Sequence, residues 1–327
     1  MRIKNKTKAL RSVLKVKFLN QRIPLAVRWQ LTNRCVWRCK YCVLWKTEVK
    51  EPSLEEIISV LDELARAGTQ TISYSGGEPM LREDIGEILR ETKKRNISTE
   101  MNSTGAFVPH YHAKLKDLDF LKISLDGNRA VHDEMRGKGS YAMAIEAAHA
   151  AQSNKLRFSF TTTLTKFNLD QIDFLVQRAQ EYKTFVAFQP VKSLYRGISD
   201  ISGLAPGHDE FRQAVLRIIR LKKEQGPCIR NSLQGLRHVI NWPSYGKLSC
   251  WAGKIFCIIN TDGTLMPCDR ISYKETLPNC LKEGFLKVFF DLPGVTCAGC
   301  GFCGVLELNF LMAMKIRGCN AILKVIQ

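Results

Sequence analysis

Short runs rich in β-branched and aromatic residues alternate with longer segments of helical periodicity between residues 25 and 192. Six of the short runs are expected to be strands, at residues 25–32, 71–76, 98–104, 120–126, 157–165 and 185–191. Helices are expected between them at residues 53–67, 82–95, 142–152 and 169–182, and a further one at 209–224. Strands and helices in alternation predict a parallel sheet with crossover helices. The expected fold is therefore α/β, a partial (β/α)6 TIM-like barrel with its chemistry at the carboxyl ends of the strands.

The cysteines divide the chain unevenly, because eight of the twelve lie between Cys250 and Cys319. This predicts a small cysteine-rich C-terminal domain, which we place at residues 236–327, after an N-terminal arm at 1–24 and the barrel core at 25–235. No apolar run approaches the roughly 18 residues of a membrane span, and no export signal is apparent. The expected location is the cytoplasm, where cysteines are metal ligands or catalytic thiols more often than disulfides.

The formal net charge of +18 is concentrated near the N-terminus. Residues 1–50 hold fourteen lysines and arginines and one acid, so they account for 13 of the 18 charges. Drawn as a helix, the arm places Leu10, Val13, Leu14 and Phe18 on one side, with basic residues on the flank. Such an arm suits an anionic membrane surface, an acidic partner or nucleic acid. It suits equally a solvated arm that packs over the start of the barrel.

Three cysteines in "CVWRCKYC", Cys35, Cys39 and Cys42, directly follow the first expected strand. Soft thiolates favour iron–sulfur clusters or zinc over harder metals. A structural zinc ion normally takes a fourth protein ligand, and neither a histidine nor a fourth cysteine lies nearby in the sequence. A zinc site or unrelated thiols remain alternatives for this motif alone. Three thiolates fit three corners of a cube-shaped cluster and leave one iron open for a small molecule.

The pattern Cys-x3-Cys-x2-Cys after a first strand resembles the signature of the radical S-adenosylmethionine (radical SAM) enzymes. The resemblance implies that the open iron of a [4Fe–4S] cluster binds the amino and carboxylate groups of S-adenosylmethionine (SAM). It also implies that an electron from the cluster cleaves SAM to a 5′-deoxyadenosyl radical, which abstracts a substrate hydrogen. Tyr41, just before the third cysteine, matches the aromatic position that lies near the adenine in this family.

"SGGEP", after the second strand, resembles the Gly-Gly-Glu-Pro element of the same family. The resemblance implies that Gly76 and Gly77 let the backbone approach SAM closely, and that the carboxylate of Glu78, beside Pro79, meets the ammonium group of SAM. Other strand ends resemble further SAM contacts: Asn102 in "MNSTG", Ser124 and Asp126 in "KISLDG" at the ribose, and Arg136 in "HDEMRG" at the carboxylate. Taken singly, Asn102, Ser124 and Arg136 are as consistent with strand-end capping or a surface ion pair. Taken together, in this order, the motifs indicate a radical SAM core.

The C-terminal cysteines resemble the SPASM and twitch extensions, which hold auxiliary [4Fe–4S] clusters. The smallest, twitch-like set forms one cluster from Cys250, Cys268, Cys297 and Cys300. A full SPASM assignment gives the first cluster Cys250, Cys257 and Cys268, and the second Cys297, Cys300, Cys303 and Cys319. The spacing departs from the usual pattern, so the grouping stays open, as does the question whether Cys280 completes the first cluster. A zinc ribbon is the alternative, because paired Cys-x2-Cys units also suit zinc.

Two isolated features complete the candidate sites. Asp262 and Gly263 suit a tight hairpin that brings Cys250 and Cys268 together. Cys228 is expected near the barrel mouth, either as a buried small hydrophobic residue or as a hydrogen donor to a substrate radical.

The resemblance implies an enzyme, a radical SAM oxidoreductase whose one or two auxiliary clusters assist oxidation, cross-linking or epimerisation. The substrate is expected to be a small molecule, a lipid or a peptide, and a maturase of ribosomal peptides or protein side chains is the alternative within the family. A non-catalytic iron–sulfur redox or binding protein is the alternative of another class. Expected partners are a reducing protein such as flavodoxin or ferredoxin and, through the basic arm, a membrane surface. Nucleic acid is not expected, because no RNA-binding module is apparent.

Overall fold

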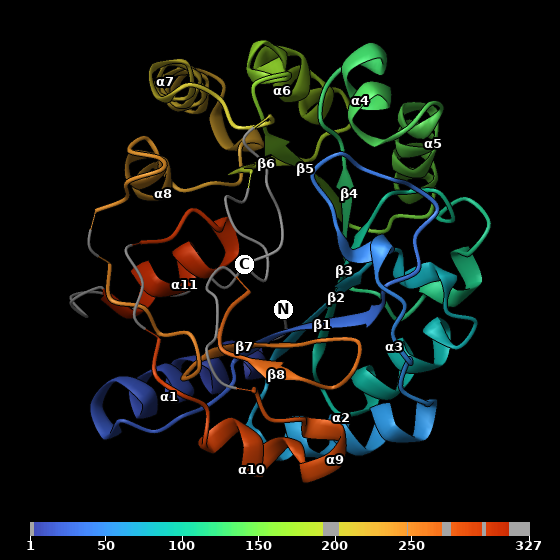
Figure 1. The fold of residues 1–327 in the computed structure, drawn as a ribbon, viewed down its shortest axis with the longest axis vertical. Helices are drawn as coiled ribbons and strands as arrows, with labels where there is room; N and C mark the ends of the chain where they lie inside the picture. Colours follow the sequence, from blue (N-terminus) through green and yellow to red (C-terminus); the bar gives the residue numbers. More distant parts are fainter. Residues whose placement is uncertain (1–2, 192–202, 247, 270–275, 296–298, 314–327) are drawn as a thin grey trace.

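The computed structural model describes residues 3–191, 203–246, 248–269, 276–295 and 299–313, and its centre is one eight-stranded sheet (Figure 1). The strand order is β6-β5-β4-β3-β2-β1-β7-β8, and every pairing is parallel except that of β7 with β8. All six strands expected from the sequence are confirmed, and the described sheet does not close on itself. The partial barrel is therefore confirmed. The strands are β1 (Ala26–Thr32), β2 (Thr71–Gly76), β3 (Ser98–Ser103), β4 (Phe120–Ser124), β5 (Phe158–Leu164), β6 (Phe185–Pro190), β7 (Phe256–Ile259) and β8 (Leu265–Met266).

Helices connect successive strands and surround the sheet (Figure 1). The expected start of α2 is confirmed by a capping box, in which Ser53 Oγ accepts from Glu56 N and the Glu56 side chain accepts from Ser53 N. The helices are α1 (Ile3–Leu19), α2 (Leu54–Ala67), α3 (Ile85–Lys94), α4 (Arg129–Arg136), α5 (Ser140–Ser153), α6 (Ile172–Glu181), α7 (His208–Glu224), α8 (Leu233–Val239), α9 (Cys280–Glu283), α10 (Phe285–Phe290) and α11 (Cys303–Ala313). Short 3-10 turns are η1 (Leu44–Lys46), η2 (Pro79–Leu81), η3 (His112–Leu115), η4 (Leu169–Gln171) and η5 (Gly226–Cys228).

The two faces of the sheet carry different side chains, because successive residues of a strand point to opposite sides. On β4, Leu121 and Ile123 are buried in the main apolar core, which the helices cover. Lys122 and Ser124 alternate with them and are half-buried on the inner face. The outer face thus supplies the packing, and the inner face is free to carry polar groups.

The C-terminal cysteine region begins as an extension of the same sheet. β7 pairs in parallel with β1, so that Val27 lies opposite Cys257, and the chain then turns back into β8. The turn requires glycine: Gly263 has φ +85°, and a Cβ there would lie 2.5 Å from Leu281 Cγ. The hairpin expected at Asp262 and Gly263 is confirmed.

The N-terminal arm is a helix that packs against this C-terminal region. Val13 and Val16 of α1 are buried in a second apolar cluster, together with Ile255 and Phe256. Phe18, expected on the same side of the helix as Leu10 and Leu14, is 67% exposed and is not buried with this cluster. Within the described part of the chain, no helix combines the length and apolar character needed to cross a bilayer.

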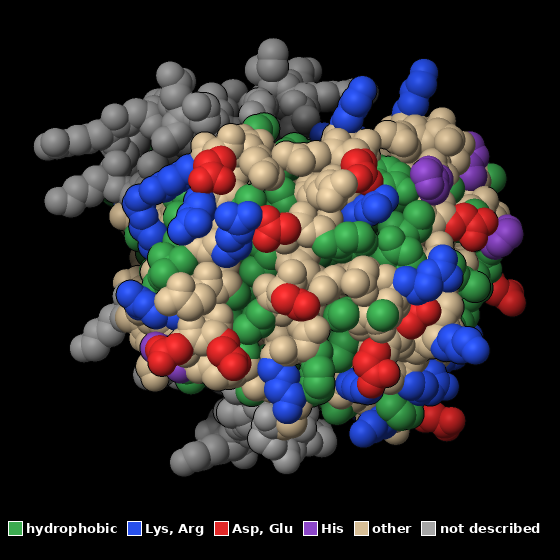
Figure 2. All heavy atoms as spheres, turned by 90° about the horizontal axis from the view of Figure 1, so that it is seen from above, with side chains coloured by type: hydrophobic (Ala, Val, Ile, Leu, Met, Phe, Trp, Pro, Cys, Tyr) green, Lys and Arg blue, Asp and Glu red, His purple; other side chains and the backbone are tan. Residues whose placement is uncertain are grey.

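The molecular surface carries both signs of charge. Over the face seen from above, lysine and arginine side chains are interspersed with acidic and apolar ones (Figure 2). The net charge alone therefore does not identify a binding surface on this face.

The sequence did not predict α4. This helix is short and mostly polar, and the side chain of Asn128 begins it by accepting from Val131 N over 3.1 Å. Its last residue is Arg136, so α4 determines where that guanidinium lies.

Candidate active site

The loop that carries Cys35, Cys39 and Cys42 leaves the carboxyl end of β1 and is fixed by backbone hydrogen bonds. Lys40 N donates to Met135 O over 3.0 Å, and Cys42 N donates to Cys39 O over 3.0 Å. Cys39 is buried, whereas Cys35 and Cys42 are half-buried. The loop is therefore held against α4 with its thiols near the surface.

The three thiols line a cavity of about 170 Å³. Burial raises the pKa of Cys35 to about 11 and also raises the pKa of Cys39, so a metal that binds these thiols would have to displace their protons. Motifs that are far apart in the sequence meet here, because the carboxyl ends of parallel strands share one edge of the sheet. The rest of the wall is formed by Trp37, Tyr41, Trp45, Gly76, Gly77, Asn102, Ser103, Thr104, Ser124 and Arg136.

Arg136 and Asp126 form a buried ion pair beside the thiols, with 2.6 Å between Arg136 Nε and Asp126 Oδ2. Tyr41 Oη donates to the same oxygen over 2.5 Å, and the guanidinium lies 5.4 Å from the centroid of the Tyr41 ring. Arg136 Nη1 is also 3.9 Å from Cys39 Sγ. Burial alone would raise the pKa of Asp126, but the charge of Arg136 and these hydrogen bonds outweigh it and lower that pKa. A fixed cation thus lies next to the thiols.

Gly76 and Gly77 let the end of β2 lie directly against the start of the cysteine loop. A Cβ at Gly76 would be 2.2 Å from Thr32 O, and a Cβ at Gly77 would be 2.0 Å from Arg34 O. Gly77 N donates to Thr32 O over 2.7 Å. Both glycines are therefore required where β2 meets the cysteine loop, and their expected role in letting the backbone approach SAM stays a prediction.

Glu78 is fully buried and ties the end of β2 to the end of β3. Its carboxylate accepts from Ser103 Oγ over 3.0 Å, from Thr104 N over 2.8 Å and from Thr104 Oγ1 over 2.7 Å. Burial raises the pKa of Glu78, although these donors oppose the shift. Within the described chain, the cavity wall contains Ser103 and Thr104 but neither Glu78 nor Pro79. Glu78 therefore orients the wall from behind.

Asn102 reaches the cavity from the inner face of β3 and belongs to a polar network below it. Asn102 Nδ2 donates to Ser73 Oγ over 3.2 Å. Lys122 Nζ donates to the same oxygen over 3.3 Å and to Glu100 Oε2 over 2.5 Å. The motifs did not identify this network, although strand alternation places Lys122 on the same face as Ser124.

The cavity wall also contains two tryptophans, Trp37 and Trp45, that the sequence motifs did not predict. Both indole N–H groups are buried and have no hydrogen-bond partner among the described residues. The Trp37 ring lies beside Gly137, where a Cβ would be 3.0 Å from Trp37 Cε3. The available signal was their position, inside and just after the cysteine motif.

Cys250, Cys268 and Cys300 are all associated with the second apolar cluster. Cys268 and Cys300 are among its buried residues, and Cys250 packs against it. Asn309 links α11 to the segment before β7, since its Nδ2 donates to Cys250 Sγ over 3.9 Å and its Oδ1 accepts from Trp251 N over 3.0 Å. These three thiols are the described members of the twitch-like set.

Cys257 lies on the other face of the β7–β8 hairpin, which corrects its expected grouping. It is fully buried in the main core, whereas its two neighbours on β7, Phe256 and Ile258, point to the other face and lie in the second cluster. Burial, together with the nearby Cys280, raises its pKa well above the ordinary value. Cys257 is therefore not brought to Cys250 and Cys268, and Cys280 shares the main core with Cys257.

The other candidate ligands of the C-terminal region are less defined. Cys303 is half-buried and begins α11. Cys297 and Cys319 lie outside the described residues.

Cys228 lies at the opposite end of the sheet from the thiol cavity. It ends η5 and is buried in the main core, and the next residue, Ile229, pairs with Val186 near the amino end of β6. β1 and β6 run in the same direction, so the amino end of β6 lies at the edge of the sheet opposite the carboxyl end of β1, where the thiols are. Cys228 is therefore not near the barrel mouth, and its expected position was wrong. A role as hydrogen donor is not supported.

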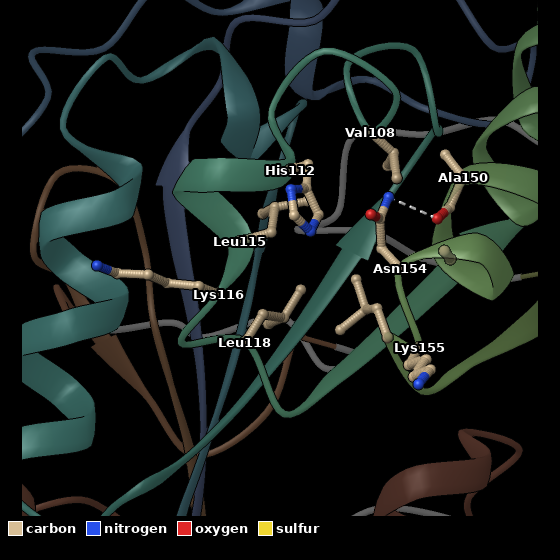
Figure 3. A pocket seen from close by; sticks show the side chains of 10 residues that line it. Val108, His112, Leu115, Lys116, Leu118, Ala150, Asn154 and Lys155 are labelled. Atoms are coloured by element: carbon tan, nitrogen blue, oxygen red, sulfur yellow. Dashed lines mark hydrogen bonds between the residues drawn. The ribbon is translucent and has the colours of Figure 1, made fainter.

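A second cavity, of about 140 Å³, lies between η3 and the end of α5 (Figure 3). Its wall combines apolar residues such as Leu115 and Leu118 with His112 and Lys155. The Asn154 side chain turns back to donate to Ala150 O over 2.8 Å. Among the described residues the wall contains no cysteine or carboxylate, so we assign it no chemistry.

Within the described ranges, no three His, Cys, Asp or Glu side chains are arranged to hold a single metal ion. A cuboidal cluster distributes its thiolate ligands over separate irons, so thiols spread around a common cavity suit such a cluster. The side chains of the cavity fit such a cluster with a small polar molecule beside it. Three thiols are soft metal ligands, and a fixed cation with several amide and hydroxyl groups lies next to them.

Comparison with known proteins finds similar sequences and similar folds. The model of the radical SAM superfamily matches residues 29–179. Mycofactocin maturase MftC of Mycolicibacterium smegmatis is 26% identical over 273 residues, which cover 80% of this chain and 68% of the relative. Fe-coproporphyrin III synthase of Methanosarcina barkeri is 30% identical over 175 residues, which cover 51% of this chain but 44% of that protein.

Among solved structures, SuiB of Streptococcus suis bound to its precursor peptide SuiA has the same fold. The TM-score is 0.69 at 17% sequence identity, and the match covers 88% of this chain and 69% of SuiB. Another structure of SuiB contains S-adenosylmethionine.

Proposed function

Because the chain belongs to the radical SAM superfamily, whose enzymes use a [4Fe–4S] cluster and SAM, we propose that it is an oxidoreductase that modifies a peptide. The chemistry that the bound cluster supplies is reductive cleavage of SAM to methionine and a 5′-deoxyadenosyl radical, which removes a substrate hydrogen. The observation that carries the proposal is that the carboxyl ends of β1 to β4 share one cavity, in which three thiols lie beside a fixed cation.

Within this cavity we assign cluster binding to Cys35, Cys39 and Cys42. Arg136 supplies a positive charge for the SAM carboxylate, and its buried pairing with Asp126 holds that charge in place. We assign Tyr41 to the adenine side of the site, where the hydrogen bond from its hydroxyl to Asp126 would hold the ring in place. The remaining positions that we assign to SAM, directly or as support for the wall, are Gly76, Gly77, Glu78, Pro79, Asn102 and Ser124.

We assign one auxiliary cluster to the second apolar cluster, with Cys250, Cys268 and Cys300 as ligands and Cys297 as the fourth. The apolar side chains packed near these thiols would shield a bound cluster from water, which would suit electron transfer within the protein. We place this unit within residues 236–327, although its first strand, β7, belongs to the central sheet. Cys303 and Cys319 remain candidates for a second cluster.

A peptide is the proposed substrate class for two reasons. The relatives that this chain resembles over most of its length include a mycofactocin maturase and a protein solved with its precursor peptide. The inner face of the sheet below the cavity also presents amide, hydroxyl and charged side chains, the groups that bind a peptide backbone. A flavodoxin or ferredoxin is the proposed source of electrons.

The proposed activity is tested by anaerobic reconstitution with iron and sulfide, followed by incubation with SAM and dithionite. We expect 5′-deoxyadenosine and methionine in equal amounts, and about eight irons per chain if one auxiliary cluster is present. A reconstituted protein that forms no 5′-deoxyadenosine would instead be the non-catalytic iron–sulfur protein.

A further inference from the structure

Exposed basic side chains surround the loop that carries the three thiols. Two apolar side chains lie among them and face solvent, Val36 and Phe167, each 42% exposed. Exposed apolar groups bordered by charge are typical of surfaces that contact other proteins. We call the four basic residues the basic rim: Arg38, Lys40, Lys46 and Lys166.

One half of the basic rim is joined directly to the thiol cavity. Arg38 Cζ lies 4.9 Å and Lys46 Nζ 5.4 Å from the centroid of Trp45. Arg38 Nη1 also donates to Cys35 O over 2.7 Å. Since Trp45 and Cys35 both line the cavity, a partner on this surface is separated from the thiol site by about one layer of side chains.

The other half of the basic rim is built around Phe167. Lys40 Nζ lies 5.9 Å and Lys166 Nζ 5.1 Å from the centroid of this ring. Such cation–π contacts hold the charges at the surface without neutralising them. Lys40 also pairs with Glu134, but both side chains are exposed, and exposed pairs of this kind are weak. A partner's carboxylate can therefore replace Glu134 at little cost.

We propose that the basic rim docks an acidic one-electron donor protein. This inference rests on the proposed function, in which an electron has to reach the cavity from outside. The donor is oxidised by one electron and the cluster with its SAM is reduced by one, so no further reactant is needed. Redox encounters use small interfaces, below about 1,200 Å², and depend on complementary charge for fast association. A rim of four cations around two exposed apolar side chains fits such a partner.

The test compares two ways of reducing the reconstituted full-length protein. The probe is a flavodoxin in its fully reduced form, and dithionite, which is small and needs no docking, is the bypass. The variant is Lys46→Glu with Lys166→Glu, which leaves Arg38 and its contact with the thiol loop in place. The rate is followed by bleaching of the visible absorbance of the cluster, a measurement that does not require turnover.

We expect the variant to lower the second-order rate of reduction by flavodoxin about tenfold at low ionic strength. Its rate with dithionite should equal that of the parent protein. The matched control is Lys116→Glu with Lys223→Glu, the same change of charge at two exposed residues near the amino ends of the strands. Lys116 extends away from its cavity in Figure 3. The cluster of the control variant should be reduced at the same rate as that of the parent protein, both by flavodoxin and by dithionite.

The proposal is overturned if the rim variant behaves like the control, or if its rate with dithionite falls as far as its rate with flavodoxin. Normal reduction by flavodoxin combined with weaker processing of a peptide would assign the surface to the substrate and also overturn it. Failure of the proposed function is a separate result, since reduction would then be normal while the parent protein forms no 5′-deoxyadenosine.

Discussion

The two cysteine regions of this chain are held by different means. Cys35, Cys39 and Cys42 lie on one short loop, clamped by backbone hydrogen bonds and placed beside the Arg136 guanidinium. The thiols Cys250, Cys268 and Cys300 come from segments before and after the β7–β8 hairpin, and all three belong to or pack against one apolar cluster. Local spacing therefore defines the first site, whereas tertiary packing decides which thiols belong to the second.

The largest effect is expected from the first region. Replacing Cys35, Cys39 and Cys42 together with alanine removes all three proposed ligands, so formation of 5′-deoxyadenosine should fall to the level of a blank without enzyme. The iron of the auxiliary site should remain, at about four per chain, because its ligands come from another region. Iron analysis and chromatography of the products check both statements. Loss of all iron in the triple variant would show that the two sites are not independent.

Within the second region, we expect Cys268→Ala and Cys257→Ala to differ sharply. Cys268 lies with Cys250 in the second apolar cluster, so its loss should remove about four irons per chain. Cys257 points into the main core, and its replacement should leave the iron content unchanged and lower the free energy of unfolding by about 1 kcal/mol. Equal loss of iron in both variants would restore the full SPASM grouping.

The buried cation of the first site should matter for stability as well. Arg136→Ala leaves the fully buried Asp126 carboxylate uncompensated, and we expect the free energy of unfolding of the protein without metal to fall by about 3–5 kcal/mol. Lys40→Ala is the matched control, because it breaks an exposed ion pair to the same helix and should cost less than about 1 kcal/mol. Urea unfolding measures both values. Similar losses in the two variants would contradict the importance of burial.

A smaller, pH-dependent effect is expected from His132, which supports the same site. Burial, reinforced by the charge of Arg136, lowers the pKa of His132 to about 4, although Asp126 and Asp133 oppose the shift. The unfolded chain takes up this proton near pH 6.5, so the folded state should lose stability as the pH falls from about 6.5 to 4. His132→Gln keeps an acceptor for Asp126 N and removes the titration. Unfolding curves across this range should be flatter for the variant, and identical slopes would refute the assignment.

How much the sequence predicted also differs between the two regions. The six strands and the convergence of their ends follow from periodicity and parallel topology, which is why widely separated motifs line one cavity. The packing of Glu78 behind the wall and the placement of Arg136 by α4 required tertiary contacts that no motif contains. In the second region, the register of β7 against β1 puts Cys257 on the core face, and register is not readable from cysteine spacing.

The same limit applies to the residues that the motifs did not identify. Trp37 and Trp45 have no signal apart from their nearness to the cysteines, and their place in the wall depends on how the loop folds over the strand ends. Cys228 is the opposite case, a residue that the sequence singled out but that the fold places away from the site. Its position in the sequence did not reveal that it lies near the amino end of β6.

The most direct test of the central claim is the electron paramagnetic resonance spectrum of the reduced protein, recorded with and without SAM. If Cys35, Cys39 and Cys42 hold a cluster with one open iron, SAM should shift the signal of that cluster and leave the auxiliary signal unchanged. The shift should be absent in the variant without these three cysteines. A spectrum of the parent protein that is identical with and without SAM, at full iron content, would contradict the account.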